Sequence, residues 1–253
     1  MSSSNPVLFI SGPPFSAKMW EKTRARLEAQ GVKTVAVDLL DAARGVACVS
    51  NLAEHLAARI QEMPTPPLLV AHGTAVPVVS RAAVRAQPAG LVLTNGPLHE
   101  PDFAARALAA VPRSLLSQLI LRPRLWLRYL ASSAGLRRAV INPYVMDHDM
   151  VVAVCGPLVQ TAENREAVAI FIKDLCMPRP PAPAFAGPTL LIWGDADPLY
   201  PIHVAQQQVL ENSKTELVFV EGGQHLHPIE RPWAIADAIR DWWAEQRTMT
   251  SMS

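Results

Sequence analysis

The sequence predicts an α/β fold in which helices flank a mostly parallel sheet, and two observations support this prediction. Short apolar runs alternate along the chain with longer amphipathic stretches. Strands that are joined through helices form right-handed crossovers and therefore run parallel. One helix-like stretch of about ninety residues interrupts the alternation and contains no clear strand. We therefore expect one sheet that carries one large helical insertion.

The first part of the chain supplies four expected strands and the helices between them. The strands are expected at Val7–Ile10, Thr34–Val37, Leu68–Ala71 and Leu91–Thr94. An Asn just before an apolar-periodic run is a typical helix N-cap, which predicts a helix start at Asn51. The three helices are expected from about Ala17 to Gln30, from Asn51 to about Glu62 and from about Ala75 to Ala86.

The second part of the chain returns to the sheet after the insertion. Strands are expected at Thr189–Trp193 and Glu216–Val220, and a last helix at about Pro232–Gln246, with proline in its first turn. The insertion, residues 98–187, reads as helices at Phe103–Ala110, Ser114–Leu121, Leu125–Ala131, Val151–Val154 and Arg165–Leu175. Ligands of open α/β sheets lie beyond the carboxyl ends of the strands. We therefore expect 98–187 to form a lid between two core segments, 1–97 and 188–253.

Composition excludes several classes of function. The chain has 253 residues, 23 basic and 22 acidic side chains and a net charge of +1, so no basic surplus is present to bind nucleic acid. It has no apolar run long enough for a membrane span and no secretory leader. Its three cysteines form no CxxC pair. We expect a cytoplasmic protein, monomer or homodimer, that binds a small molecule and neither metal nor membrane.

Four segments carry the informative residues: three are formed by an expected strand and the loop after it, and the fourth is the loop after the last expected strand. They read VLFISGPPFSAKMW (7–20), LLVAHGTAV (68–76), LLIWGDADPLYP (190–201) and EGGQHLHPIERP (221–232). In this order they resemble the oxyanion loop, nucleophile elbow, acid loop and histidine loop of the α/β-hydrolase family. The resemblance covers nearly the whole chain outside the lid. It implies the α/β-hydrolase sheet.

The last two segments imply a pair of catalytic residues. By the resemblance, Asp197 is the acid and His225 the base, whereas Asp195 and His227 each lie two residues off the family positions. A carboxylate at a strand end can hold one ring nitrogen of an imidazole and leave the other free to accept a proton. Such a dyad can act as a general base near neutral pH.

The elbow departs from the family pattern. That pattern is small-x-nucleophile-x-small, and Ala71–Ala75 fits its small flanks with Gly73 in the place of the nucleophile. A register with Thr74 as nucleophile would put His72 at a position that must be small. Because glycine has no side chain, no covalent intermediate can form at Gly73. This is the sharpest inference that the sequence allows.

The oxyanion loop departs from the pattern as well. The spacing from Ser11 to Trp20 matches the family, and in that register Pro13 stands where a backbone N–H should point at the oxyanion. Proline has no N–H, so only the N–H of Thr74 would remain. Losing one such donor costs about 10²–10³ in rate for acyl transfer. Serine-type ester hydrolysis is therefore not expected.

Other polar residues leave two interpretations each. Ser11 is either a pocket hydroxyl in place of the family's histidine or a hydroxyl that satisfies its own loop. His72 points either to the rim of the pocket or into the core. A cluster in the lid could donate a proton or hold a metal, but a solvated turn is the favoured interpretation; its members are Tyr144, Asp147, His148 and Asp149.

Three functions fit these residues. The favoured one is a cofactor-independent, non-hydrolytic enzyme in which His225, oriented by Asp197, performs general acid–base chemistry on a small carbonyl-bearing molecule. β-Elimination, cyclisation and retro-aldol cleavage, as in natural-product pathways, are reactions of this kind, and the α/β-hydrolase family includes such non-hydrolytic members. One alternative is a catalytically inactive, ligand-binding pseudoenzyme. The other is a hydrolase in which His225 activates water.

Overall fold

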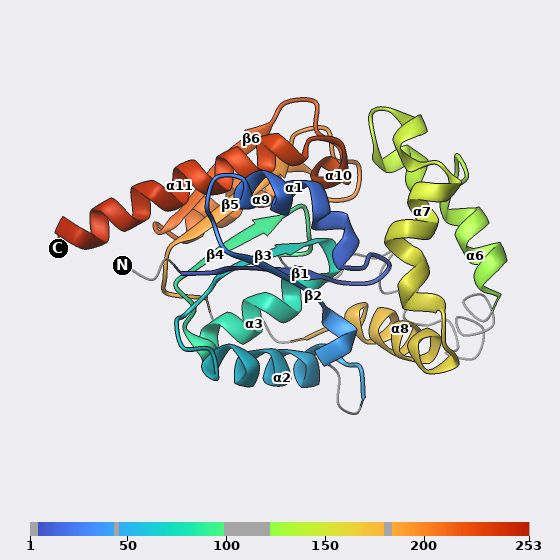
Figure 1. Cartoon of the computed structure of the whole chain (residues 1–253), viewed down its shortest axis with the longest axis horizontal. Coiled ribbons are helices and arrows are strands. Elements are labelled where there is room, and N and C mark those ends of the chain that lie inside the picture. The colour runs from blue at the N-terminus through green and yellow to red at the C-terminus, as the bar shows by residue number, and fades with distance from the viewer. Residues whose placement is uncertain (1–4, 43–45, 99–121, 180–183, 253) are drawn as a thin grey trace.

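The protein contains one six-stranded parallel sheet (Figure 1). The computed structural model describes residues 5–42, 46–98, 122–179 and 184–252. The strands lie in the order β2-β1-β3-β4-β5-β6, and each neighbouring pair is parallel. Their bounds are β1 Val7–Ser11, β2 Thr34–Asp38, β3 Leu68–His72, β4 Gly90–Thr94, β5 Thr189–Gly194 and β6 Thr215–Val220. The predicted α/β fold class is confirmed.

Helices cover both faces of the sheet (Figure 1). One face packs against α1 (Glu21–Glu28), with the 3₁₀ turn η1 (Ala17–Trp20) before it, and α11 (Pro232–Met252). The other face packs against α2 (Val49–Gln61), α3 (Val76–Ala86) and α9 (Ile202–Glu211). Successive side chains of a strand point to opposite faces, so Phe9 joins the cluster with Trp20 and its neighbour Ile10 the cluster with Leu52. This explains the continuous apolar runs, since a parallel strand is buried on both sides.

The segment between β4 and β5 is helical where the structure describes it. Its described part, residues 122–179, which we call the cap, contains helices and 3₁₀ turns and no strand. The elements are α6 Pro123–Leu130, η4 Leu136–Ala139, η5 Pro143–Met146, α7 His148–Cys155, η6 Gly156–Val159 and α8 Ala162–Leu175. The two helices expected at Phe103–Ala110 and Ser114–Leu121 lie outside the described residues. The division into 1–97, 98–187 and 188–253 stays a prediction.

The cap contacts loops that follow β1 and β6. The N–H of Ser16, after β1, donates to the carbonyl of Val154 in α7 at 2.7 Å. The N–H of Leu226, after β6, donates to the carbonyl of Ala139 in η4 at 2.9 Å. Because the strands are parallel, both loops lie at the carboxyl edge of the sheet, and Figure 1 shows the cap helices grouped at one end of the sheet.

The predicted start of α2 at Asn51 is wrong. The helix begins at Val49 with Cys48 as N-cap, and the N–H of Val49 donates to the carboxylate of Asp174 in α8 at 2.8 Å. The Asn51 side chain instead donates to the carbonyl of Val46. A carboxylate from another helix thus accepts the N–H that a local N-cap side chain would otherwise accept. A contact between residues so far apart in sequence cannot be predicted from a local pattern.

Two further elements differ from the expectation. A short helix, α10 (His227–Glu230), directly follows the histidine loop, and α11 continues to Met252 instead of ending near Gln246. Among the described residues, no helix is long and apolar enough to cross a membrane.

Candidate active site

Two loops at the carboxyl edge bring Asp197 and His225 together. Asp197 follows β5 and His225 follows β6, and these strands are neighbours in the sheet. Nδ1 of His225 lies 3.0 Å from Oδ2 of Asp197, and both side chains are buried. An ionised carboxylate can only accept hydrogen bonds, so Nδ1 carries the hydrogen and Nε2 has a free lone pair.

The carboxylate of Asp197 accepts two further hydrogen bonds. Its Oδ2 accepts from the side-chain amide of Asn95, and its Oδ1 accepts from the N–H of Leu199 at 2.7 Å. Burial raises the pKa of the Asp197 carboxyl, but the hydrogen bonds from His225, Asn95 and Leu199 outweigh it and leave the pKa below its ordinary value. Asp197 therefore stays ionised at neutral pH.

Asn95 is a site residue that the sequence analysis missed. It follows β4, is fully buried and has a φ of 27°, a region that Asn enters more readily than most residues. Its amide donates to Asp197, and its Oδ1 accepts the N–H of Gly194 at 2.9 Å. Asn95 thus fixes the end of β5 and the acid with one side chain. Asn95 directly follows an expected strand, and the loops that hold the other residues of the site follow strands too, so this position could have identified it.

Gly73 lies at the sharp turn from β3 into η3 (Gly73–Ala75) and α3. Its φ is 56°, in the left-handed region. A Cβ on Gly73 would stand 3.7 Å from Nε2 of His225 and 3.9 Å from the carbonyl oxygen of Asn95. Any side chain at position 73 would therefore start beside the free nitrogen of the imidazole, as an elbow nucleophile must.

The loop after β1 packs directly on this turn. The hydroxyl of Thr74 donates to the carbonyl of Pro13 at 2.6 Å. A Cβ on Gly12 would stand 2.5 Å from Oγ1 of Thr74 and 2.7 Å from the N of Ala75, so only glycine permits this approach. Ser11 is buried, and its hydroxyl has no hydrogen-bond partner among the described residues. The structure thus brings Pro13 into contact with Thr74, and Ser11 lies two residues before Pro13 at the end of β1.

Two other histidines are buried beside the dyad. Nδ1 of His72 lies 2.8 Å from Oγ1 of Thr94, and the His72 ring centroid lies 4.8 Å from that of His225. His227 lies 6.2 Å from His72 by ring centroids and donates from Nδ1 to the carbonyl of Gln224 at 3.0 Å. Burial lowers the pKa of His72 well below its ordinary value and that of His227 to about 4. Both are therefore neutral at pH 7, and His72 lies in the core.

The residues of the predicted lid cluster are exposed on the cap surface. Tyr144 is 79% exposed and lies against the guanidinium of Arg137. Asp147 is the N-cap of α7 and accepts the N–H of Met150 at 2.8 Å, while His148 and Asp149 are exposed in the first turn. These positions match the solvated turn, and the described residues contain no group of three ligating side chains suited to a metal ion.

A parallel sheet whose strand-to-helix elbow faces a histidine–carboxylate pair defines an α/β-hydrolase-fold protein. The chain belongs to the alpha/beta hydrolase family, whose sequence model matches residues 7–238. Most members of this fold family are enzymes. No curated protein matches the chain in sequence.

Solved structures show the same fold. A thermophilic esterase from Thermogutta terrifontis matches with a TM-score of 0.72 and 20% identity over 96% of this chain and 90% of that one. A haloalkane dehalogenase from Bradyrhizobium elkani matches with a TM-score of 0.78 and 18% identity, covering 98% and 93%. An alpha/beta hydrolase fold protein from Burkholderia ambifaria gives 0.71 and 20%, covering 95% and 92%. At these identities the likeness concerns the fold alone.

Proposed function

We propose that the protein is an enzyme that uses His225 and Asp197 for general acid–base chemistry on a small carbonyl-bearing molecule, without a covalent nucleophile. One observation carries the proposal: Nε2 of His225 faces the place of a side chain at residue 73, which is glycine. The base and its carboxylate are present, and the group that such a base activates in a hydrolase is absent. In the proposed reaction, the base therefore removes a proton from the substrate itself.

The favoured reaction is a β-elimination that starts with proton abstraction. Nε2 of His225 accepts a proton from the carbon next to a carbonyl, and the electron pair of that C–H bond moves to form an enolate. The enolate oxygen accepts a hydrogen bond from the N–H of Thr74. The electron pair then forms the carbon–carbon double bond as the β-substituent leaves, and the imidazolium returns its proton to a leaving hydroxyl, which departs as water.

Asp197 contributes by remaining ionised throughout. Because the pKa of its carboxyl lies below the ordinary value, it carries a negative charge when His225 takes up the proton. The 3.0 Å contact then joins an imidazolium to a carboxylate, which stabilises the protonated base. Asn95 and Leu199 prevent the carboxylate from turning away from the ring by holding both of its oxygens.

A second candidate function rests on the same place beside His225. An oxygen of a water molecule could occupy the position of the missing side chain, and Nε2 could accept its proton. This would make the protein a hydrolase that acts without an acyl-enzyme. Pro13 argues against ordinary esters as substrates, because the oxyanion would receive one backbone donor fewer.

A ligand-binding pseudoenzyme is the third candidate. A binding protein has no need of a buried carboxylate that holds one histidine through several hydrogen bonds. Saturable binding of metabolites with no chemical change would favour it over both enzymatic functions.

The experiment that tests the proposal is carbon–deuterium exchange in D₂O. A panel of small β-keto and β-hydroxy carbonyl compounds is incubated with the protein, and loss of the proton next to the carbonyl is followed by NMR. We expect exchange or elimination with at least one compound, and a loss of about 10²-fold or more in His225→Ala. His203→Ala, an exposed histidine on α9, is the matched control and should keep the wild-type rate. Equal rates in His225→Ala and wild type would refute the mechanism.

Assays with p-nitrophenyl acyl esters separate the second candidate from the first. Turnover by the wild type that disappears in His225→Ala would indicate water activation. The absence of ester turnover, together with exchange at carbon, is the result expected of the proposed enzyme.

A further inference from the structure

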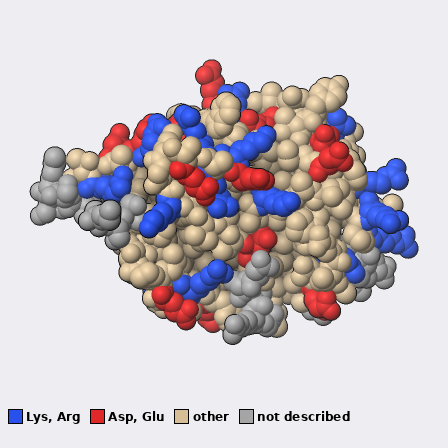
Figure 2. All heavy atoms as spheres, in the orientation of Figure 1, with Lys and Arg blue, Asp and Glu red and all other residues tan. Residues whose placement is uncertain are grey.

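One part of the cap, residues 122–155, has a net positive charge that comes from arginine alone. Residues 122–155 contain five arginines, no lysine and two acidic residues, whereas the whole chain has a net charge of +1. In the described part of the chain, none of the five forms an ion pair with a carboxylate. Figure 2 shows blue side chains gathered at the right-hand end of the molecule, where the cap lies. The arginines are Arg122, Arg124, Arg128, Arg137 and Arg138.

Four of these arginines line two hollows in the cap surface. The first has a volume of about 380 Å³ and is lined by Ser133, Arg137, Arg138, Pro143 and Tyr144. The second has a volume of about 320 Å³ and is lined by Arg124, Leu127, Arg128, His148 and Val152. Each hollow is thus lined by two arginine side chains together with apolar or aromatic residues.

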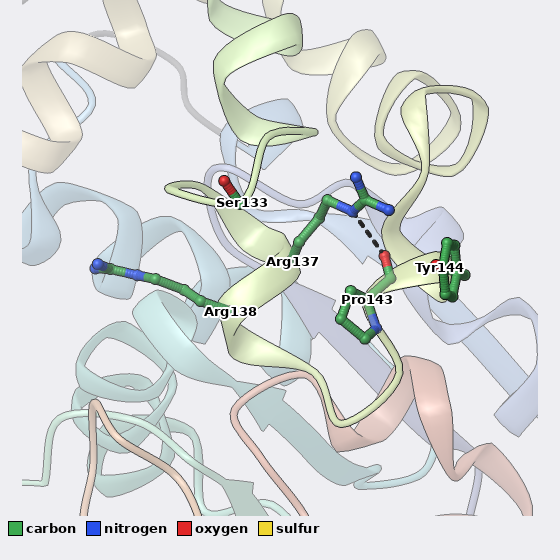
Figure 3. A pocket seen from close by; sticks show the side chains of 5 residues that line it. All are labelled: Ser133, Arg137, Arg138, Pro143 and Tyr144. Atoms are coloured by element: carbon green, nitrogen blue, oxygen red, sulfur yellow. Dashed lines mark hydrogen bonds between the residues drawn. The ribbon is translucent and has the colours of Figure 1, made fainter.

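Arg137 is held in place at the first hollow. Its Nε donates to the carbonyl of Pro143 at 2.9 Å, and its guanidinium carbon lies 5.6 Å from the centre of the Tyr144 ring. Figure 3 shows Arg137 and Tyr144 on the same side of the hollow, with Arg138 extended the opposite way. A guanidinium that is already oriented loses less entropy when it binds a carboxylate. The exposed Tyr144 ring adds a rigid apolar contact beside it.

We propose that this surface, the two hollows and their arginines, is a docking site for a protein with an acidic surface. Arginine matches carboxylates in a two-pronged geometry, and Arg and Tyr are the residues that dominate the centres of protein interfaces. Asp or Glu side chains that protrude from a folded partner can enter hollows of this size. The near-neutral charge of the whole chain disfavours a nucleic acid.

The docking site adjoins the candidate active site through the backbone. Arg138 is followed by Ala139, whose carbonyl accepts the N–H of Leu226, the residue after His225. A partner seated on Arg137 and Arg138 therefore rests on the segment that contacts the histidine loop. This placement suits a partner that delivers or receives the small molecule.

The test is binding of three anionic probes to the full chain. They are fluorescein-labelled poly-L-glutamate, a DNA duplex, and phosphatidylcholine vesicles that contain phosphatidylglycerol. We expect the strongest binding to poly-L-glutamate, weaker at higher salt, and a loss of about tenfold or more in the double variant Arg137→Glu, Arg138→Glu. Arg59→Glu, an exposed arginine on α2, is the matched control and should bind like wild type.

A second measurement maps the contact on the unaltered protein. Poly-L-glutamate should protect Arg137 and Arg138 from modification by phenylglyoxal, as read by mass spectrometry, and leave Arg59 reactive. The proposal is overturned by tighter binding of DNA or vesicles, by absence of poly-L-glutamate binding, or by binding that survives the double substitution. None of these outcomes bears on His225, so the docking site and the proposed chemistry stand or fall separately.

Discussion

Nε2 of His225 lies 3.7 Å from the point that a Cβ on Gly73 would occupy. The imidazole is oriented as if toward a nucleophile, with Nδ1 held by Asp197, although residue 73 has no side chain. A φ of 56° at Gly73 shows that the backbone also keeps the turn that such a nucleophile needs. The relationship between these two residues can be tested without knowledge of the substrate.

Gly73→Cys should create a reactive thiol beside His225. A thiolate is favoured next to an imidazole that can accept its proton, so alkylation by iodoacetamide near pH 7 should be at least about tenfold faster than in Gly73→Cys, His225→Ala. The left-handed φ should cost about 1–2 kcal/mol of stability in both variants. Wild type, in which Cys48 is half-buried and the other two cysteines are buried, gives the background rate. Equal rates in the two variants would show that residue 73 does not face the imidazole.

Asn95→Ala should destabilise the protein and hold the Asp197 carboxylate less firmly. The substitution leaves the N–H of Gly194 without its partner and removes one donor from the Asp197 carboxylate. We expect a loss of about 1–3 kcal/mol in the free energy of unfolding, measured with urea at pH 7. The pKa of Asp197 should rise, because a hydrogen bond that favours its charged form is lost. Asn51→Ala, a half-buried amide on α2 whose one hydrogen bond goes to the carbonyl of Val46, should change stability far less.

The location of Asn95 shows where sequence-based prediction ends. Apolar runs and the strand-end motifs predicted all six strands, and the motifs named Asp197 and His225, which the structure places 3.0 Å apart. Asn95 and Asp197 are 102 residues apart in sequence and meet because β4 and β5 are neighbours. Strand order depends on the packing of the whole chain, and a local pattern does not report it.

The same reason explains the wrong start of α2. The carboxylate that caps Val49 comes from Asp174, 125 residues further along the chain. The contacts of His72 with Thr94 and His225 also depend on tertiary packing. By contrast, the missing side chain of Gly73 and the missing N–H of Pro13 are properties of single residues, and both were visible in the sequence.

Acid should destabilise the protein through His227. The pKa of this buried imidazole is about 4 in the folded state and about 6.5 when unfolded, so the unfolded chain binds more protons between these values. The contribution of His227 to the free energy of unfolding is fully present above pH 6.5, and it falls by about 3 kcal/mol as the pH drops to 4. Urea unfolding across this range measures the slope. His227→Leu should reduce this slope and leave the part that comes from the buried His72, whereas His203→Ala should not change it. An unchanged slope in His227→Leu would contradict the assignment.

Glu230 should couple the cap to the histidine loop. Its carboxylate accepts the N–H groups of Ile141 and Asn142, each at 2.9 Å, and the N–H of Leu226 donates to Ala139 in the same stretch of the cap. Glu230→Ala removes two charge-assisted hydrogen bonds, which should cost about 1–3 kcal/mol.

Hydrogen exchange can show whether this loss spreads to the loop that carries His225. If the cap segment and the histidine loop open as one unit, the amides of Ile141, Asn142 and Leu226 should all exchange about tenfold faster in Glu230→Ala. Glu211→Ala, on the exposed end of α9, should leave their exchange unchanged. Faster exchange confined to Ile141 and Asn142 would show that the two segments open separately. Faster exchange of Leu226 as well would mean that opening of the cap segment also opens the residue next to His225.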